Sequence, residues 1–148
     1  MSHIATLEKI RHVREHEKRS AKQAHHQSIK AFEEVATKLY NLLKKKENAK
    51  EAYDLSLQSK TTVQHLKEQS LYIDKLNDQI IHLQEQVNIA REKMEQKREN
   101  LTDAHIEVKK FEKMIEQQHE RLKESALKRE NEMMDDISIK QHLNRKNR

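Results

Sequence analysis

The residues best suited to chemistry in this chain are its ten histidines. His12 and His16 lie four positions apart, so they would share one face of a helix, and such a pair can ligate zinc. The pair supplies only two ligands, however, and neither His3 nor the flanking acidic residues give a clear third. His25 and His26 are adjacent, and the chain has no cysteine. We therefore expect solvated histidines on helix faces, with no metal site and no cofactor.

No pattern in the sequence predicts an enzyme. The chain has no glycine and therefore no glycine-rich phosphate loop, and it has no cysteine nucleophile. Its carboxylates are abundant but alternate with lysine and arginine, as they do on the solvated flanks of a coiled coil. We expect a protein that catalyses nothing and works by binding other proteins.

The composition predicts very few turns and no compact core. The 148 residues include no glycine and no proline, the two residues that most often interrupt regular structure. Charged residues make up 37% and hydrophobic residues 34% of the chain. This apolar content is low for a globular core but suits a thin seam between helices.

The second half carries a long heptad pattern. Its first row is apolar throughout: Leu66, Ile73, Ile80, Val87, Met94, Leu101, Val108, Ile115 and Leu122. The row three positions further on is apolar at five of its eight residues: Gln69, Leu76, Leu83, Ala90, Lys97, Ala104, Phe111 and Gln118. Such a repeat predicts a long helix in a left-handed coiled coil. After Leu122 the register slips, so this helix is expected to continue without the same packing partner.

The first half has a weaker version of the same pattern. The rows that start at Ile4 and Leu7 are largely apolar from Phe32 to Tyr53, but they are mostly basic or polar over residues 11–28. An alternative stripe covers part of that gap through Ile10, Val13, Ala21, Ala24 and Ile29. Long basic side chains can also lie along a seam with their stems buried and their charges in water. We expect one helix with a weakly packed middle.

A stretch rich in serine and threonine, residues 55–62, separates the two patterns. Serine and threonine compete with helix by bonding to nearby backbone groups, and Thr61 followed by Gln64 fits a capping box at a helix start. We predict an all-α protein of one domain, an antiparallel left-handed coiled-coil hairpin of two long, unequal helices. The expected parts are a helix over about 3–57, a turn over about 58–60, a helix over about 61–143 and a basic C-terminal tail.

The hairpin predicts which residues meet. With a short turn, residues whose numbers add up to about 120 face each other, so Phe32 would lie near Val87 and Ala90. Residues beyond Leu122 would have no partner within the chain, and such an overhang needs another molecule to pack against or it frays.

The formal net charge of +5 is concentrated at the ends. Lys140, Arg145, Lys146 and Arg148 stand in the last twelve residues without an acid, which suggests an acidic partner surface, a membrane face or nucleic acid. The run 44–46 could also grip phosphates, but no nucleic-acid module is visible, so we expect no nucleic-acid partner. No apolar segment is long enough for a signal peptide or a membrane span, and the lack of cysteine fits a reducing compartment. We expect a cytoplasmic protein that reaches the inner face of the cell membrane only through partners.

Three strings carry a family resemblance: Ala31 to Tyr40 (AFEEVATKLY), Leu71 to Leu76 (LYIDKL), and Lys128 to Asp136 (KRENEMMDD) followed by the basic tail. Together with the length and the hairpin, they resemble the FliJ family, small coiled-coil proteins of the bacterial flagellar type III export apparatus. The resemblance covers essentially the whole chain. Many members carry glycine at the turn, where this chain has Ser59 and Lys60.

The resemblance implies a function as a stalk. Family members are similar in fold to the central stalk of rotary ATPases. They are thought to bind the hexameric ring of the flagellar export ATPase and the cytoplasmic domain of the membrane export-gate protein, and to handle export chaperones. The positions that match the gate contact are Tyr53, Tyr72, Leu76, Gln79 and Leu83, of which Gln79 and Leu83 differ from other members. The ATPase would meet the two ends of the chain, where candidate residues are Arg11, Arg14, Lys18, Met133, Ile137 and Lys140.

Simpler interpretations stay open beside these. Tyr53, Leu76 and Leu83 lie on the heptad rows and could be plain packing residues, whereas Tyr40 and Tyr72 lie off the seam, where aromatic residues often serve interfaces. The whole chain could also be a coiled-coil scaffold that dimerises through the overhang, a stalk protein of a related injectisome, or a basic binder of nucleic acid or membrane surfaces.

Overall fold

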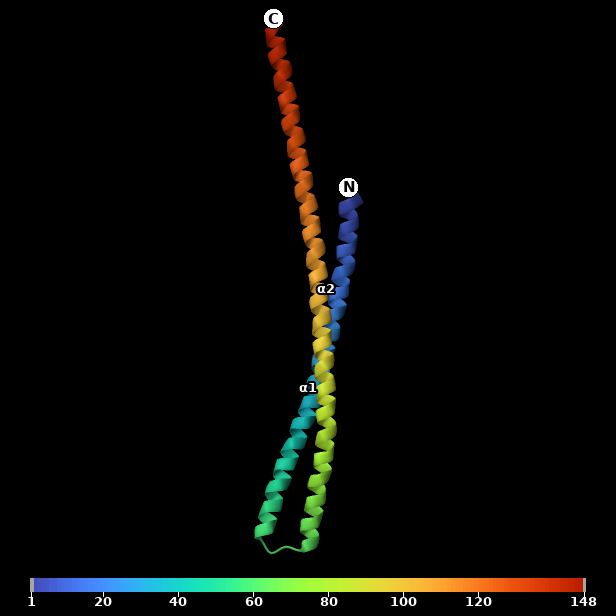
Figure 1. The fold of residues 1–148 in the computed structure, drawn as a ribbon, viewed down its shortest axis with the longest axis vertical. Helices are drawn as coiled ribbons and strands as arrows, with labels where there is room; N and C mark the ends of the chain where they lie inside the picture. The colour runs from blue at the N-terminus through green and yellow to red at the C-terminus, as the bar shows by residue number, and fades with distance from the viewer. Residues whose placement is uncertain (1, 148) are drawn as a thin grey trace. The chain divides into compact units, whose positions relative to one another are not determined.

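The structure of the protein is a computed structural model that describes residues 2–147. It consists of two helices, α1 (Ser2–Gln58) and α2 (Val63–Lys146), joined by a linker over residues 59–62 (Figure 1). The described range contains no strand, and the helices pack against each other as a hairpin. The predicted all-α class and helical hairpin are therefore confirmed, while the hand of the supercoil stays a prediction. The linker begins one residue later than the expected turn, and α2 continues through the stretch expected as a basic tail.

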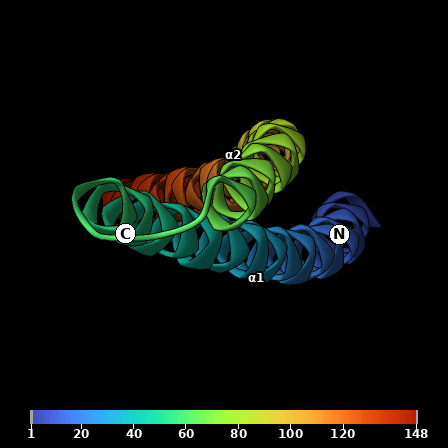
Figure 2. The same cartoon turned by 90° about the horizontal axis from the view of Figure 1, so that it is seen from below.

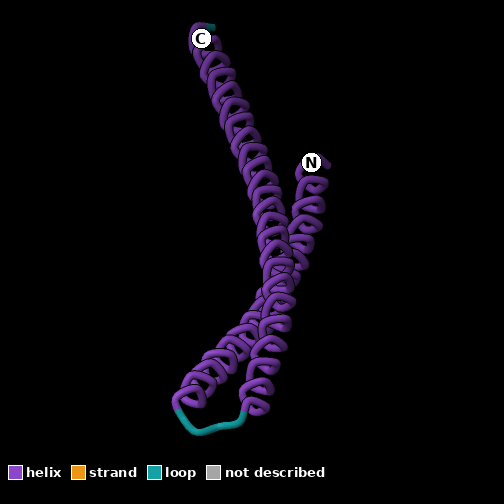
Figure 3. Tube along the Cα trace, turned by 60° about the horizontal axis from the view of Figure 1, so that its bottom comes forward, coloured by secondary structure: helices purple, strands orange, loops and turns teal. Residues whose placement is uncertain are grey.

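The linker is the one loop between the two helices over the described residues (Figure 3), and side chains of serine and threonine bond to the backbone at its two ends. The backbone N–H of His65 donates to Thr62 Oγ1 at 3.1 Å, and the N–H of Leu66 donates to the Thr62 carbonyl at 3.2 Å. Thr62 is thus the N-cap of α2, because its side chain satisfies an N–H that the first helical turn leaves without a partner. The predicted capping box of Thr61 and Gln64 is wrong by one residue. At the other end, the backbone N–H and the hydroxyl of Ser59 both donate to the Ser56 carbonyl, at 3.3 and 3.2 Å.

The seam of α1 follows the strict heptad rows. Every residue of the rows that start at Ile4 and Leu7 is buried or half-buried, including the basic and polar ones over residues 11–28. The alternative stripe is wrong at Val13, which is 52% exposed. Ser28, at 5% exposed, is the one buried polar residue among those described, and its hydroxyl donates to the His25 carbonyl at 2.6 Å. The aliphatic stems of the long basic side chains thus lie in the seam, as those of amphipathic side chains can.

The apolar core comes from α2. Its buried side chains are Leu76, Ile80, Val87, Val108 and Ile115, and both heptad rows are buried or half-buried from Leu66 to Gln118. No described side chain is less than 2% exposed, as expected for a seam that is one layer thick. From His119 to Asn147 every residue is exposed. We call residues 119–147 the overhang.

The chain divides into two compact units. The linker unit comprises residues 19–103 and contains the loop that joins the helices, which Figure 2 shows from below. The terminal unit comprises residues 2–18 of α1 and residues 104–147 of α2. Within the terminal unit, α2 continues well past the start of α1, so the overhang has no helix beside it (Figure 1).

Candidate partner-binding surfaces

Two contacts fix the pairing of the helices in the linker unit. The Arg91 guanidinium lies over the Phe32 ring, 5.8 Å from its centroid. Because Arg91 directly follows Ala90, which was predicted beside Phe32, the antiparallel register agrees with the prediction here. Nearer the linker, Gln69 Nε2 donates to Ser56 Oγ at 3.2 Å. The two helices are therefore bridged by side chains close to the point where the chain turns.

Three of the five predicted gate residues line shallow grooves of the linker unit. Tyr53 is half-buried in a groove of about 380 Å³, whose other lining residues are Lys50, Asp54, Ser70, Ile73 and Asp74. Gln79 is exposed and Leu83 half-buried in a second groove of about 410 Å³, completed by Leu42, Asp78 and His82. A partner side chain can reach both grooves without displacing the helices.

The other two gate residues differ sharply from each other. Tyr72 is 50% exposed and free to meet a partner, whereas Leu76 is 3% exposed and part of the core. A direct contact to Leu76 would require the seam to open, so packing is the role its position supports.

The sequence analysis missed a group of exposed apolar residues that flank the linker. Leu55, Leu57, Val63 and Leu71 are all more than half exposed, and Val63, at 81%, is the most exposed of them. All four lie off the heptad rows, which is the signal that could have revealed them. Together with Tyr72 we call them the linker-end residues. Several exposed apolar side chains near one end of a protein are typical of an interaction site.

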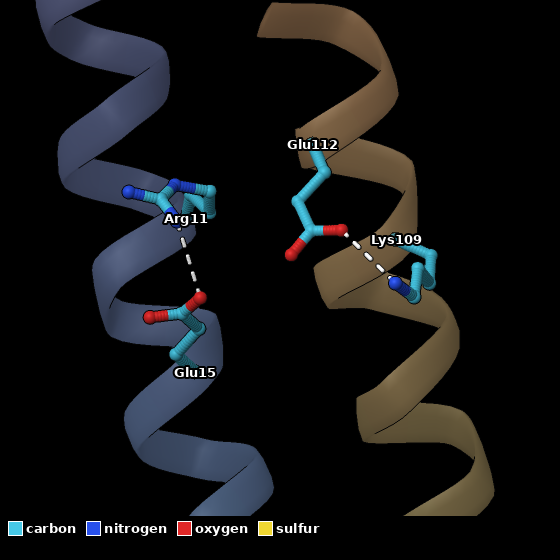
Figure 4. Close-up of polar contacts among 4 residues, drawn as sticks. All are labelled: Arg11, Glu15, Lys109 and Glu112. Atoms are coloured by element: carbon cyan, nitrogen blue, oxygen red, sulfur yellow. Dashed lines mark hydrogen bonds and ion pairs between the residues drawn. The ribbon is translucent and has the colours of Figure 1, made fainter.

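Each helix of the terminal unit carries an ion pair between its own side chains (Figure 4). On α1, Arg11 Nη1 donates to Glu15 Oε1 at 3.2 Å, and both side chains are 35% exposed. On α2, Lys109 Nζ donates to Glu112 Oε2 at 3.3 Å. These are pairs within one helix, which contribute only a few tenths of a kcal/mol each in isolation.

Arg14 joins the two helices of the terminal unit. Its guanidinium lies over the Phe111 ring of α2, 5.9 Å from the centroid, and its Nη1 donates to both carboxylate oxygens of Glu17, at 3.1 and 3.0 Å. Its Nε is buried without a hydrogen-bond partner among the described residues. Lys18 is also half-buried, on the row that starts at Ile4 and includes Arg11. The three basic residues of α1 predicted to meet the ATPase, Arg11, Arg14 and Lys18, therefore lie along the seam with only part of each side chain exposed.

The α2 residues predicted to meet the ATPase are freely accessible. Met133, Ile137 and Lys140 are all exposed on the overhang. They stand among further exposed apolar residues, namely Leu122, Leu127, Met134, Ile139 and Leu143. A helix without a packing partner gains little stability from propensity alone, so a partner that covers these apolar side chains would stabilise it.

Within residues 2–147 no three His, Cys, Asp or Glu side chains are grouped to hold a metal ion, and His12 and His16 are part of no such group. Over the same range, neither helix has a segment apolar and long enough to cross a membrane.

A two-helix hairpin with a thin, partly charged seam and an unpartnered helical extension defines a coiled-coil interaction protein. The comparisons with known proteins are specific. The family described as "Flagellar FliJ protein" matches residues 2–147. The chain is 37% identical over 143 residues to the Flagellar FliJ protein of Bacillus subtilis (strain 168), a match that covers 97% of each chain. No solved structure matches. The chain belongs to the flagellar FliJ family and is a component of flagellar protein export.

Proposed function

We propose that this protein is a non-catalytic stalk that couples the hexameric ring of the flagellar export ATPase to the cytoplasmic domain of the membrane export gate, and that it assists export chaperones. The observation that carries the proposal is the overhang, in which every described residue is exposed although several are large and apolar. Family membership supplies the system in which its partners are sought. The match to a flagellar relative over nearly the whole chain favours the flagellum over an injectisome.

The ATPase end of the stalk is the overhang. Met133 and Ile137 offer apolar side chains one helical turn apart, and Lys140 adds a positive charge beside them. Arg11, Arg14 and Lys18 have a supporting role in this proposal, because they lie along the seam of α1, where Arg14 contacts Phe111 of α2, and are only partly exposed to the ring. A helix inside a ring offers many equivalent faces to several subunits, which suits exposed side chains all around it.

The gate end is the region around the linker. Tyr72 and the other linker-end residues provide exposed apolar surface, and the grooves beside Tyr53 and beside Leu83 and Gln79 give a partner's side chains places to insert. Leu76 contributes by holding α2 in place beneath them. In this arrangement the protein is cytoplasmic and is held at the inner face of the membrane through the gate.

The ATPase contact is tested by hydrolysis. The rate of the cognate export ATPase is measured with the wild-type protein and with the double variant Met133→Ser and Ile137→Ser. Stimulation by the wild type and a loss of at least tenfold in apparent affinity for the double variant are expected. Replacing the exposed Ser138 by alanine on the same segment is the matched control and should change nothing. Absence of any stimulation or co-elution with the wild-type protein would refute the stalk function.

The gate contact is tested separately. Binding to the purified cytoplasmic domain of the gate protein should weaken with Tyr72→Ala and stay unchanged with Tyr40→Ala, since Tyr40 is even more exposed, at 61% against 50%, but lies further from the linker along α1. Equal effects of the two substitutions would contradict the assignment of the gate to the linker end. Chaperone binding is tested by co-elution with each export chaperone of the same organism.

A further inference from the structure

The charges of the overhang fall into two adjacent blocks of opposite sign. The basic block, residues 121–129, has four basic residues and one acid: Arg121, Lys123, Lys128, Arg129 and Glu124. The acidic block, residues 130–138, has four acids and no base: Glu130, Glu132, Asp135 and Asp136. All are exposed, and none makes an ion pair with another residue of the described chain.

An apolar stripe runs through both blocks. At 100° per residue, Leu122, Ala126, Met133 and Ile137 lie within about 60° of one another on the helix. Their spacing is symmetric about the junction between Arg129 and Glu130, which is also the boundary between the two charge blocks. A reversal of direction about that junction exchanges Leu122 with Ile137, Ala126 with Met133, and one block with the other.

We propose that a second copy of this chain docks on the overhang in antiparallel orientation, with a two-fold axis at the junction of Arg129 and Glu130. Leu122 then packs against the partner subunit's Ile137, and Ala126 packs against the partner subunit's Met133. The basic block of each copy faces the acidic block of the other. Because the interface is isologous, each of these contacts occurs twice.

The charges select the orientation. A parallel pair would set basic block against basic block and acidic block against acidic block, and facing like charges are unfavourable. The antiparallel pair satisfies both blocks at once, which no single-charge partner surface could do. It uses residues 119–140, beginning directly after Gln118, the last half-buried residue of α2, so it leaves the hairpin seam intact.

The interface covers Met133 and Ile137, the residues proposed to contact the ATPase. Self-association would therefore compete with ring binding and keep the overhang covered in molecules that have no ATPase. This consequence rests on the proposed function, whereas the dimer itself does not.

Two charge-reversed variants of the full chain test the dimer by analytical ultracentrifugation. The first replaces Arg121, Lys123, Lys128 and Arg129 by glutamate, which makes the whole overhang segment acidic. The second replaces Glu130, Glu132, Asp135 and Asp136 by lysine, which makes it basic. Circular dichroism of each variant establishes that the hairpin is still folded.

The expected results differ for each sample. The wild-type mass should rise from monomer toward dimer with concentration, and 1 M NaCl should lower the dimer fraction because salt screens exposed charges. Each variant alone should be a monomer, whereas an equimolar mixture of the two should form a heterodimer. A wild-type protein that stays monomeric at about 100 μM in low salt would overturn the proposal, as would variants that dimerise alone.

Cysteine cross-linking tests the orientation, since the chain has no cysteine of its own. Under mild oxidation, Leu122→Cys protein mixed with Ile137→Cys protein should give a cross-linked heterodimer. Leu122→Cys alone should not cross-link, because antiparallel pairing leaves those positions about 22 Å apart along the axis. The matched control mixes Glu124→Cys with Asp135→Cys. These two positions lie at the same height along the antiparallel pair but on the side of each helix that faces away from the partner, so they should not cross-link. Cross-linking of Leu122→Cys with itself would indicate a parallel pair and overturn the proposal.

These measurements use no ATPase, so their failure leaves the stalk function standing. Loss of ATPase stimulation in the hydrolysis assay would, conversely, leave the dimer standing.

Discussion

Replacing Leu76 by alanine should lower the free energy of unfolding by about 2–3 kcal/mol. Leu76 is 3% exposed, so the substitution removes three carbon groups from a nearly dry position. At about 0.8 kcal/mol for each, the lost burial amounts to roughly 2.4 kcal/mol. The cavity left by the substitution adds little, because neighbouring side chains and water can close over a gap in a seam one layer thick. The total destabilisation therefore lies near the low end of the range for leucine-to-alanine substitutions.

Urea denaturation followed by circular dichroism at 222 nm measures this loss. The matched control is Leu71→Ala on the same helix, where the side chain is 59% exposed and the expected change is below about 1 kcal/mol. The midpoint for Leu76→Ala should therefore fall well below that for Leu71→Ala, with the denaturant slope unchanged. Equal midpoints for the two variants would refute the assignment of Leu76 to the core.

A conservative variant separates packing from direct contact with the gate. Leu76→Met keeps nearly the same volume and should change stability by less than about 1.5 kcal/mol. If Leu76 only supports the surface, Leu76→Met should bind the gate domain as the wild type does. Weak gate binding by a stable Leu76→Met protein would show that the gate reaches Leu76 itself.

Three further predictions concern the seam, the cap and the overhang. Val13→Glu should leave the melting temperature nearly unchanged, whereas Arg14→Glu should lower it by several degrees, because it sets a carboxylate against an aromatic ring; equal shifts would contradict the heptad seam of α1. Thr62→Ala should cost about 1 kcal/mol of stability and Thr61→Ala much less, and the reverse order in urea denaturation would restore the capping box predicted from the sequence. Deleting residues 122–148 should leave the thermal transition of the hairpin within a few degrees of the wild type while abolishing ATPase stimulation, and a truncated protein that still stimulates would exclude the overhang as the contact.

The heptads of α2 were predictable because its apolar residues repeat strictly and depend on no other part of the chain. The seam residues in the basic stretch of α1 were harder to predict. Hydropathy favours Val13 for the seam, but the structure places Arg14 there, because Phe111 on the other helix offers its ring to the guanidinium. That neighbour is almost a hundred residues away along the chain, so no local pattern reveals it.

The sequence misplaced the start of α2 and did not reveal the linker-end residues, for two different reasons. Thr61 and Thr62 are chemically equivalent cap candidates, and the choice depends on which residue precedes the first helical backbone angles. Val63 and its exposed neighbours were missed because a heptad pattern predicts only the residues on its rows, and these apolar residues lie off the rows. The gate and ATPase residues came from family resemblance, and their role in binding stays a prediction.

The buried side chains of α2 come in two groups, Leu76 to Val87 and Val108 to Ile115, with only half-buried row positions such as Lys97 between them. Backbone amides exchange with solvent through local opening, whose free energy depends on how much apolar surface the opening exposes. The amides around each group should therefore exchange slowly with deuterium, and those of the stretch between them, although equally helical, should exchange sooner. One continuous helix would then contain two stretches of high protection separated by a stretch that opens first.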